Sequence, residues 1–301
     1  TNKPAALAMA VEKAKETDAE LVMASDPDAD RVGAAVKNNE GEWVLLNGNQ
    51  TALMFVYYLI TRWKELGKIN GKEYIVKTIV TTETIKTIAE RNGVEMYDVY
   101  TGFKWIANVM RENEGKKNYI GGGEESYGFL CEDFVRDKDA VSACVILAEI
   151  AAWAKDQGLS LYQLLQKIYV EYGFSKEKGI SVVKKGKSGA EEIEAMMKKF
   201  RENPLTEIAG SKVTYFYDYS TLKGKDYAEN ETVTLDMPTT SNVLQYFTED
   251  NTKVSIRPSG TEPKIKFYCE VHSKVKSIDE LPEAEKAAEE KINQIKASLG
   301  I

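Results

Sequence analysis

The stretch LVMASDPDADRVG, residues 21–33, runs an apolar segment directly into a loop with three aspartates. Leu21 to Met23 predict a short buried strand. The preceding residues, about Pro4 to Glu16, predict a helix, because an early proline suits the first turn and the apolar residues fall on one side. Ligands of open α/β sheets bind at the carboxyl ends of strands. We therefore expect an α/β layer with a binding loop after Met23.

Helix and strand patterns continue to alternate as far as Tyr172, which is typical of a layered sheet flanked by helices. The expected strands and helices of this stretch are Trp43 to Leu46, Gln50 to Glu65, Tyr74 to Val80, Thr84 to Arg91, Glu95 to Tyr100, Phe103 to Arg111, Asn118 to Gly121, Ala140 to Asp156 and Leu161 to Tyr172.

The pattern changes after Tyr172. Residues 173–189 are rich in Lys and Gly and predict a linker. Residues 190–301 group their strands together and place helices at the ends, which predicts a small α+β domain. Its expected elements are Ala190 to Arg201, Lys212 to Tyr217, Val243 to Thr248, Lys253 to Ile256, Lys264 to Val271 and Leu281 to Ser298.

Composition excludes several classes of function. A net charge of -7 over 301 residues argues against nucleic acid as a partner, because affinity for nucleic acid rests on clustered Lys and Arg. Three widely separated cysteines without metal-ligand spacing favour a reducing compartment, and we expect the cytoplasm. The longest apolar run, Thr51 to Ile60, is too short to span a bilayer. Since the chain starts at Thr1 without a methionine, we expect a fragment.

The aspartate loop predicts a metal site. In an extended segment, Asp26, Asp28 and Asp30 would point the same way, and three converging carboxylates favour Mg²⁺. An EF-hand is excluded, because Arg31 and Lys37 stand where it needs Gly and Glu. An aspartyl-phosphate phosphatase and a solvated turn remain open as alternatives.

Two further loops carry groups that suit a phosphorylated sugar. IGGGEESYGF, residues 120–129, combines glycines, which let a backbone approach a ligand, with carboxylates and a hydroxyl. VSIRPSGTEPKIKFY, residues 254–268, offers an arginine fork and two hydroxyls to an anion. Without a ligand-binding role, the first loop would simply be a tight bend and the second a hairpin turn. The sole histidine, His272, ends a strand, which leaves a Ser-His-Asp triad and a phosphohistidine mechanism without support.

Four motifs in this order, DPDADR, TGFKW, GEESYG and RPSGTEPK, resemble the functional loops of the α-D-phosphohexomutase superfamily, the phosphoglucomutases and phosphomannomutases. That family has three related α/β/α domains and a smaller α+β domain. The resemblance implies that residues 1–46 end domain two, residues 47–172 form domain three, and residues 190–301 form domain four. The expected fold class is therefore α/β, with one partial and one complete three-layer α/β/α domain before an α+β domain.

The resemblance also implies roles for individual residues. Asp26, Asp28 and Asp30 match the Mg²⁺ ligands, and Arg31 matches the arginine that contacts phosphate. Thr101 matches a threonine that contacts the substrate, and Glu124 and Ser126 match the residues that hold the sugar hydroxyls. Lys138 in RDKDA matches a lysine that contacts the substrate or assists proton transfer. The loop that holds the idle phosphate is matched by Arg257, Ser259, Gly260 and Thr261. Pro27 replaces the glycine of many members and resembles the branch with bacterial phosphoglucomutases and phosphopentomutases.

The family transfers phosphate through a phosphoserine in a motif like T-A-S-H-N-P, which this sequence does not contain. The resemblance implies an isomerase that interconverts sugar 1-phosphate and 6-phosphate through a sugar 1,6-bisphosphate, with the remaining domains of the same polypeptide as partners. We expect the present chain to be inactive alone. A non-catalytic phosphosugar-binding module and a mannose or pentose specificity are the alternatives.

Overall fold

The computed structural model describes residues 4–184, 186–260 and 262–301. The chain forms two compact units, Thr1–Tyr172 and Gly173–Ile301, each described here by itself. Both units combine helices with sheets, which confirms the α/β prediction.

The first unit opens with a three-stranded antiparallel sheet of β1 (Leu21–Ser25), β2 (Val32–Lys37) and β3 (Trp43–Leu46), in the order β1-β2-β3. Helix α1 (Pro4–Glu16) packs on it through Leu7 and Ala14, which meet Val22 and Ala35. The strand β2, which follows the aspartate loop directly, was not predicted. Its register with β1 makes the loop at residues 26–31 the turn of a hairpin.

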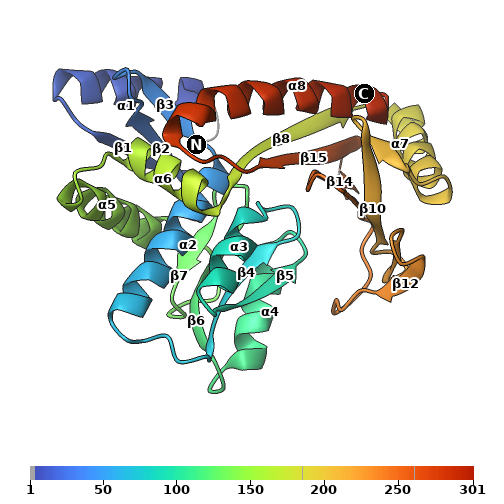
Figure 1. The fold of residues 1–301 in the computed structure, drawn as a ribbon, viewed down its shortest axis with the longest axis horizontal. Coiled ribbons are helices and arrows are strands. Elements are labelled where there is room, and N and C mark those ends of the chain that lie inside the picture. The colour runs from blue at the N-terminus through green and yellow to red at the C-terminus, as the bar shows by residue number, and fades with distance from the viewer. Residues whose placement is uncertain (1–3, 185, 261) are drawn as a thin grey trace. The chain divides into compact units, whose positions relative to one another are not determined.

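The second sheet has the order β5-β4-β6-β7, with β4 parallel to β5 and β6, and β7 antiparallel to β6. Helices pack on both of its faces (Figure 1), α4 through Phe103, Ile106 and Met110 on the face of Val76, and α2 through Leu59 on the face of Gly121. The elements of this layered unit are α2 (Gly48–Glu65), β4 (Glu73–Thr78), α3 (Thr84–Arg91), β5 (Glu95–Val99), α4 (Phe103–Asn113), β6 (Asn118–Gly123), β7 (Phe129–Cys131), α5 (Ala140–Asp156) and α6 (Leu161–Tyr172).

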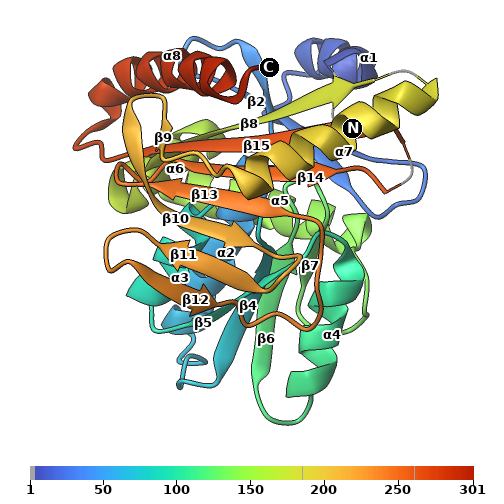
Figure 2. The same cartoon turned by 90° about the vertical axis from the view of Figure 1, so that its right-hand side faces the viewer.

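The second unit is built on one antiparallel sheet (Figure 2), whose strand order in the described residues is β12-β11-β10-β13-β14-β15-β8, with β9 paired to β10. Phe200 of α7 meets Phe267 of the sheet, and α8 packs along β8 and β15. The elements are β8 (Phe174–Val183), α7 (Gly186–Glu202), β9 (Glu207–Ile208), β10 (Ser211–Asp218), β11 (Lys223–Asp226), β12 (Glu231–Thr234), β13 (Leu244–Thr248), β14 (Lys253–Pro258), β15 (Lys264–Ser273), a short 3-10 helix (Ile278–Glu280) and α8 (Leu281–Leu299).

The predicted linker at residues 173–189 is wrong. Most of it forms β8, which pairs with β15 from Phe174 opposite Ser273 to Val183 opposite Lys264. β8 ends the strand order of its sheet, so it needs hydrogen bonds to one neighbour only and tolerates lysines and a glycine in place of a hydrophobic alternation.

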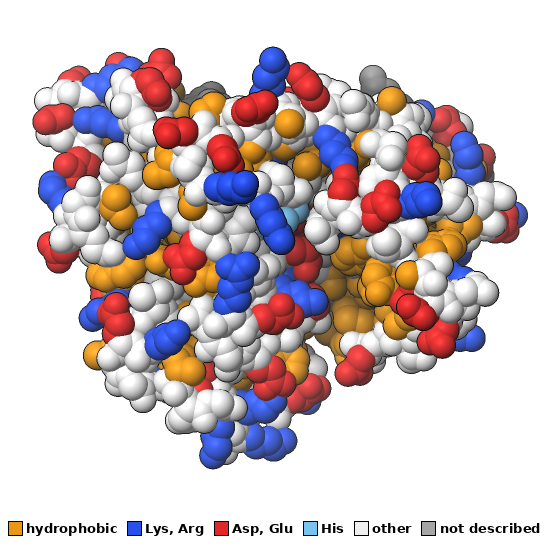
Figure 3. Space-filling view, viewed as in Figure 1, with side chains coloured by type: hydrophobic (Ala, Val, Ile, Leu, Met, Phe, Trp, Pro, Cys, Tyr) orange, Lys and Arg blue, Asp and Glu red, His pale blue; other side chains and the backbone are white. Residues whose placement is uncertain are grey.

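Two surface observations bear on the expected partners. No described helix is both long enough and apolar enough to cross a membrane. On the face drawn in Figure 3, Lys and Arg side chains are interspersed with Asp and Glu over most of the surface.

Candidate functional site

The first unit places three loops at the carboxyl edge of its parallel strands. β4, β5 and β6 run in the same direction, so the segments that follow them lie at one edge of the sheet. These segments are Ile79–Glu83, Tyr100–Gly102 and Glu124–Gly128. Ligands of α/β sheets bind at this edge, and two of the three segments carry residues predicted from the sequence.

The aspartate loop is a turn and not the extended segment expected from its spacing. Ala29 N donates to Asp26 O at 3.0 Å, and Ala29 has a φ of 55°. Asp26 Oδ1 accepts the backbone N–H groups of Asp30 and Arg31, both at 3.2 Å. Asp26 therefore stabilises the loop itself, in addition to any role toward a ligand.

Asp30 forms an ion pair with Lys138, whose Nζ lies 2.8 Å from Asp30 Oδ2. Burial raises the pKa of Asp30, but the hydrogen bond and charge of Lys138 outweigh this effect and hold the pKa below its ordinary value. Burial lowers the pKa of Lys138, whereas its bonds to Asp30 and Asp137 raise it to above its ordinary value. Both groups are thus charged at neutral pH.

The fit of this loop to a cation is partial. Asp30 Oδ1 is buried and accepts no hydrogen bond from the described residues, which leaves one carboxylate oxygen suited to a metal ion. Asp28 is exposed, however, and no three acidic, histidine or cysteine side chains of the described residues lie close enough together to hold a metal ion. Binding Mg²⁺ with all three aspartates would require Asp28 to turn toward Asp26 and Asp30.

Arg31 joins the aspartate loop to the loop after β6. Its Nε lies 3.9 Å from Asp26 Oδ2 and 3.8 Å from Asp30 Oδ1. Its backbone forms an isolated antiparallel bridge with Gly128, and the next residue, Val32, donates its N–H to Tyr127 O at 3.2 Å. The two predicted loops are therefore held together by backbone hydrogen bonds.

Lys138 contacts residues of all three predicted motifs of this unit. Its Nζ lies 5.7 Å from the ring centroid of Phe103, in the TGFKW motif. Its aliphatic stem passes so close to Gly128, in the GEESYG motif, that a Cβ there would lie 2.2 Å from Lys138 Cδ. One side chain thus contacts three motifs that are far apart in the sequence, which spacing alone could not reveal.

The GEESYG loop is organised by Glu124. The carboxylate Oε1 of Glu124 accepts the backbone N–H of Gly102 at 2.8 Å, and its own N–H donates to Gly128 O at 2.9 Å. Thr101 precedes Gly102 and is half-buried, as is Ser126. Glu124, Ser126 and Thr101 therefore belong to one neighbourhood at the start of α4.

The glycines before Glu124 permit close packing within the protein. They lie inside β6, which extends to Gly123. A Cβ on Gly122 would lie 2.5 Å from Val76 O, and one on Gly123 would lie 2.6 Å from Gly128 O. These two glycines are therefore required by contacts within the protein, and the approach of a ligand to this backbone stays a prediction.

In the second unit, the RPSGTEPK motif joins β14 to β15. Arg257 is half-buried near the end of β14, opposite Lys266. Ser259 N donates to Lys264 O at 2.7 Å, and Glu262 N donates to Ser259 Oγ at 3.3 Å, so the loop is closed by its own hydrogen bonds. Gly260 is exposed with open space around it. Thr261 lies outside the described residues.

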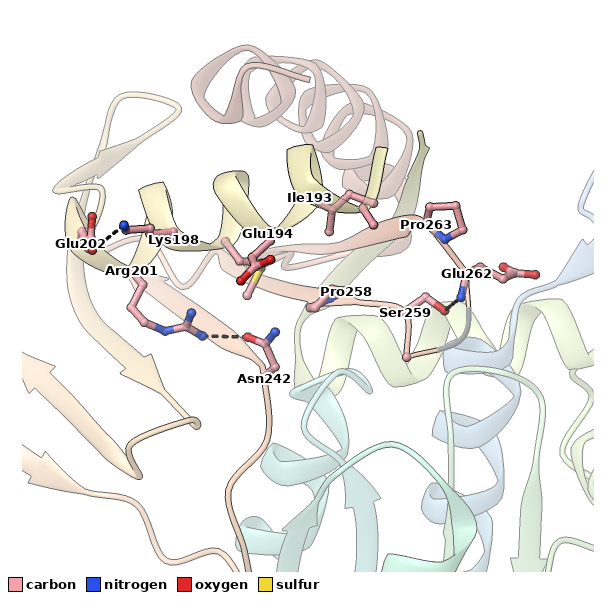
Figure 4. A pocket seen from close by; sticks show the side chains of 13 residues that line it. Ile193, Glu194, Lys198, Arg201, Glu202, Asn242, Pro258, Ser259, Glu262 and Pro263 are labelled. Carbon is pink, nitrogen blue, oxygen red and sulfur yellow. Dashed lines mark hydrogen bonds and ion pairs between the residues drawn. The ribbon is translucent and has the colours of Figure 1, made fainter. Parts of the chain in front are cut away.

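A pocket of about 760 Å³ adjoins this loop (Figure 4). Ser259, Gly260 and Glu262 form one side of it, and the α7 residues Ile193, Met197 and Arg201 form the other. Arg201 donates to Asp218 at 2.9 Å and to Asn242 at 2.8 Å, so its guanidinium is fixed by two partners at the rim.

Comparison with known sequences assigns both units. Residues 47–172 match the family model for phosphoglucomutase/phosphomannomutase, alpha/beta/alpha domain III, and residues 181–288 match the model for the C-terminal domain of the same family. The chain belongs to the phosphoglucomutase/phosphomannomutase family. The two matched segments lie in the order expected from the four motifs.

Individual relatives agree with this family. The chain is 33% identical over 264 residues to a phosphoglucomutase of Staphylococcus haemolyticus, which covers 88% of the chain and 47% of that protein. It is 38% identical over 259 residues to a phosphoglucomutase of Staphylococcus aureus, covering 86% of the chain and 46% of that protein. The chain thus spans about half the length of the curated relatives it matches.

Solved structures show the same fold. A phosphoglucomutase/phosphomannomutase family protein of Burkholderia thailandensis aligns with a TM-score of 0.61 and 19% identity over 99% of this chain and 51% of that one. The open form of a Paramecium phosphoglucomutase, parafusin, aligns with a TM-score of 0.57 and 17% identity over 94% of this chain and 46% of that one.

Proposed function

We propose that this chain is the C-terminal half of a phosphoglucomutase-type enzyme that interconverts a sugar 1-phosphate and a sugar 6-phosphate. The observation that carries the proposal is the meeting of DPDADR, TGFKW and GEESYG around Lys138, in a chain that matches two successive domains of the family. The phosphoglucomutase relatives favour glucose as the sugar.

The aspartate loop would hold Mg²⁺ through Asp26, Asp28 and Asp30. When bound, Mg²⁺ would neutralise charge on the phosphoryl oxygens during transfer. Arg31, half-exposed beside Asp26 and Asp30, would donate to the phosphoryl group at the same place. Lys138 is charged and within reach of Asp30, so it would stabilise negative charge on the substrate and position a proton near it.

The remaining loops would recognise the substrate. Glu124, Ser126 and Thr101 would bind sugar hydroxyls, since carboxylate and hydroxyl groups are suited to this task. Arg257, Ser259, Gly260 and Thr261 would hold the phosphate that is not being transferred. Binding energy at that phosphate would orient the sugar for reaction at its other end.

The phosphoryl donor would be a phosphoserine in another part of the polypeptide. The 301 residues contain no T-A-S-H-N-P-like motif, and in this proposal the side chains of the loops described above have roles in binding and not in accepting the phosphoryl group. A sugar 1,6-bisphosphate would be the intermediate and would act as an activator. The chain alone would then bind phosphosugars without converting them.

Calorimetric titration with glucose 1,6-bisphosphate, with and without Mg²⁺, tests the proposal. We expect binding by the chain and loss of at least about ten-fold in affinity for Arg257→Ala, because a bidentate arginine–phosphate contact contributes more than 1.4 kcal/mol. Lys223→Ala, which removes an exposed cation from β11, is the charge-matched control and should bind normally. Equal binding by both variants, or none by the parent chain, would contradict the proposal.

A phosphosugar-binding module without catalysis is the second candidate, favoured by the absence of the serine motif from these 301 residues. The sequence of the gene upstream of Thr1 distinguishes the two candidates. A serine-loop domain encoded before Thr1 supports the enzyme, whereas a start codon near Thr1 supports the module. If the substrate is instead a mannose or pentose 1-phosphate, the corresponding bisphosphate should bind more tightly than glucose 1,6-bisphosphate in the same titration.

A further inference from the structure

Glu125 lies between Glu124 and Ser126, which are proposed to bind the sugar, but Glu125 itself forms hydrogen bonds within the protein. Thr78 Oγ1 donates to Glu125 Oε2 at 3.2 Å, and Thr81 Oγ1 approaches the same oxygen at 3.5 Å. The N–H of Glu125 donates to Thr81 Oγ1 at 3.2 Å. Thr81 therefore contacts both the side chain and the backbone of Glu125.

The turn that provides these threonines is itself fixed. The hydroxyls of Thr78 and Thr81 lie 2.8 Å apart, and both residues are buried. Thr82 N donates to Asn49 Oδ1 at 3.0 Å, which ties the turn to the first residues of α2. Gly48, also in α2, packs so close that a Cβ there would lie 2.0 Å from Glu125 O. Glu125 is thus held from two elements.

Glu124 and Glu125 are fastened to the ends of different strands. Glu124 accepts from Gly102, which follows β5, whereas Glu125 accepts from Thr78, which ends β4. Tyr127, two residues after Glu125, has a φ of 74°, a conformation that costs free energy for a residue with a side chain and persists only where the surroundings enforce it. The anchored Glu124 and Glu125 precede this residue. On its other side, Tyr127 O accepts the N–H of Val32 at 3.2 Å and Gly128 bridges to Arg31, so the backbone is held on both sides of Tyr127.

We infer that Glu125 is a positioning residue, which Thr78 and Thr81 hold so that Glu124 and Ser126 present their side chains to the sugar hydroxyls. This inference rests on the proposed function, since it presupposes that Glu124 and Ser126 bind a sugar. Glu125 itself does not touch the ligand. Its role is to fix the backbone that carries its two neighbours.

The test compares two probes that differ only in the sugar part. Glucose 1,6-bisphosphate carries ring hydroxyls between its phosphates, whereas 1,6-hexanediol bisphosphate carries two phosphates and no hydroxyls. Thr81→Val should lower affinity for the sugar bisphosphate about ten-fold, the size of one or two lost hydrogen bonds, and leave affinity for the diol bisphosphate unchanged. Thr81→Ser, which keeps the hydroxyl, should bind like the parent chain.

Two controls separate positioning from loss of structure. Thr87→Val makes the same change on α3 and should leave both affinities and the melting temperature unchanged. Glu125→Gln keeps the shape of the side chain and weakens its acceptor, so it should reproduce the selective loss if Thr81→Val does not fold. A merely structural role would lower both affinities together.

The outcomes separate the inference from the proposed function. If the parent chain prefers the sugar bisphosphate and the folded variants keep that preference in full, the inference is overturned and the proposed function stands. If the parent chain binds both probes equally, sugar recognition by this loop fails, and the inference fails with it.

Discussion

At the scale of single residues, the aspartate loop depends on the pairing of Asp30 with Lys138, whose side chains are 24% and 12% exposed. An ion pair with this little solvent contact is weakly screened. Removing one partner leaves a charge whose other partner lies farther away, at 3.2 Å for Lys138 with Asp137 and at 3.8 Å for Asp30 with Arg31. The stem of Lys138 also packs against Gly128. Charge and packing are therefore lost together when this lysine is changed.

We expect Lys138→Met, which keeps most of the stem, to lower the free energy of unfolding of the first unit by about 1–3 kcal/mol. Asp30→Asn should lower it by a smaller amount, and the double variant should show a coupling of about 1 kcal/mol. Urea denaturation followed by tryptophan fluorescence reports this unit alone, because Trp43, Trp63, Trp105 and Trp153 all lie within it. Strictly additive effects would contradict the pairing.

A second residue-scale prediction concerns Glu73, a buried carboxylate at the start of β4. Its Oε2 accepts the N–H groups of Asn70, Gly71 and Lys72 at 2.7 to 3.1 Å, and Oε1 accepts from Asn118 at 3.0 Å. Burial raises the pKa of Glu73, but these hydrogen bonds outweigh it, so the pKa lies below its ordinary value.

A carboxylate with a lowered pKa stabilises the fold above its ordinary pKa, near 4.3, and loses that contribution as the pH falls through the folded value. Glu73→Gln should therefore cost about 1–3 kcal/mol at pH 7, and the difference from the parent chain should shrink as the pH falls below about 4.3. Urea denaturation at several pH values measures it. Glu90→Gln, whose carboxylate is exposed, is the control. A pH-independent difference would exclude this mechanism.

The sequence predicted which loops form the candidate site but not how these loops contact one another. The residues after Met23 and after β6 do form loops at strand ends, as the apolar runs before them predict. The contacts that organise them join residues far apart in the chain, such as Asp30 to Lys138 and Glu125 to Thr78. No local pattern encodes such pairs, because they depend on which strands become neighbours in the sheet.

At the scale of elements, the amphipathic helices were predicted well, whereas two strands at the ends of the second unit's sheet were missed. The ends of α3, α5 and α6 agree with their expected limits, since each buries one apolar face. By contrast, β8 and β12 lie at the two ends of one sheet and are rich in charged or hydroxyl side chains. Edge strands need no hydrophobic alternation on an exposed side, so periodicity does not identify them.

The close contact of β6 with β4 provides a prediction at this scale. Gly122→Ala would place a Cβ 2.5 Å from the backbone oxygen Val76 O and 2.7 Å from the hydroxyl of Tyr119. A backbone atom inside a sheet cannot move away without a cost in free energy, so we expect the free energy of unfolding to fall by about 1–3 kcal/mol or more.

Gly179→Ala is the matched control, because it also changes a strand glycine but has nothing within 4 Å of the new Cβ. It should alter stability by less than about 1 kcal/mol. Differential scanning calorimetry of both variants measures the effect, and an equal melting temperature for the two would show that β6 can shift away from β4.

At the scale of the whole molecule, the chain has two compact units and spans about half the length of its phosphoglucomutase relatives. In the proposed function its loops bind and orient the substrate, and a transfer of phosphate also needs a group that accepts it. Positioning can lower a barrier by many kcal/mol, but only when a nucleophile is held against the phosphorus.

We therefore expect the 301-residue chain to convert glucose 1-phosphate into glucose 6-phosphate no faster than a buffer control, even with Mg²⁺ and glucose 1,6-bisphosphate present. The reaction is followed by coupling the product to glucose 6-phosphate dehydrogenase. The Arg257→Ala variant is assayed in parallel, since turnover from a contaminating mutase would survive that substitution. Turnover that the parent chain shows and Arg257→Ala loses would mean that a residue within these two units accepts the phosphoryl group. In that case the assignment of the nucleophile to another part of the polypeptide would be wrong.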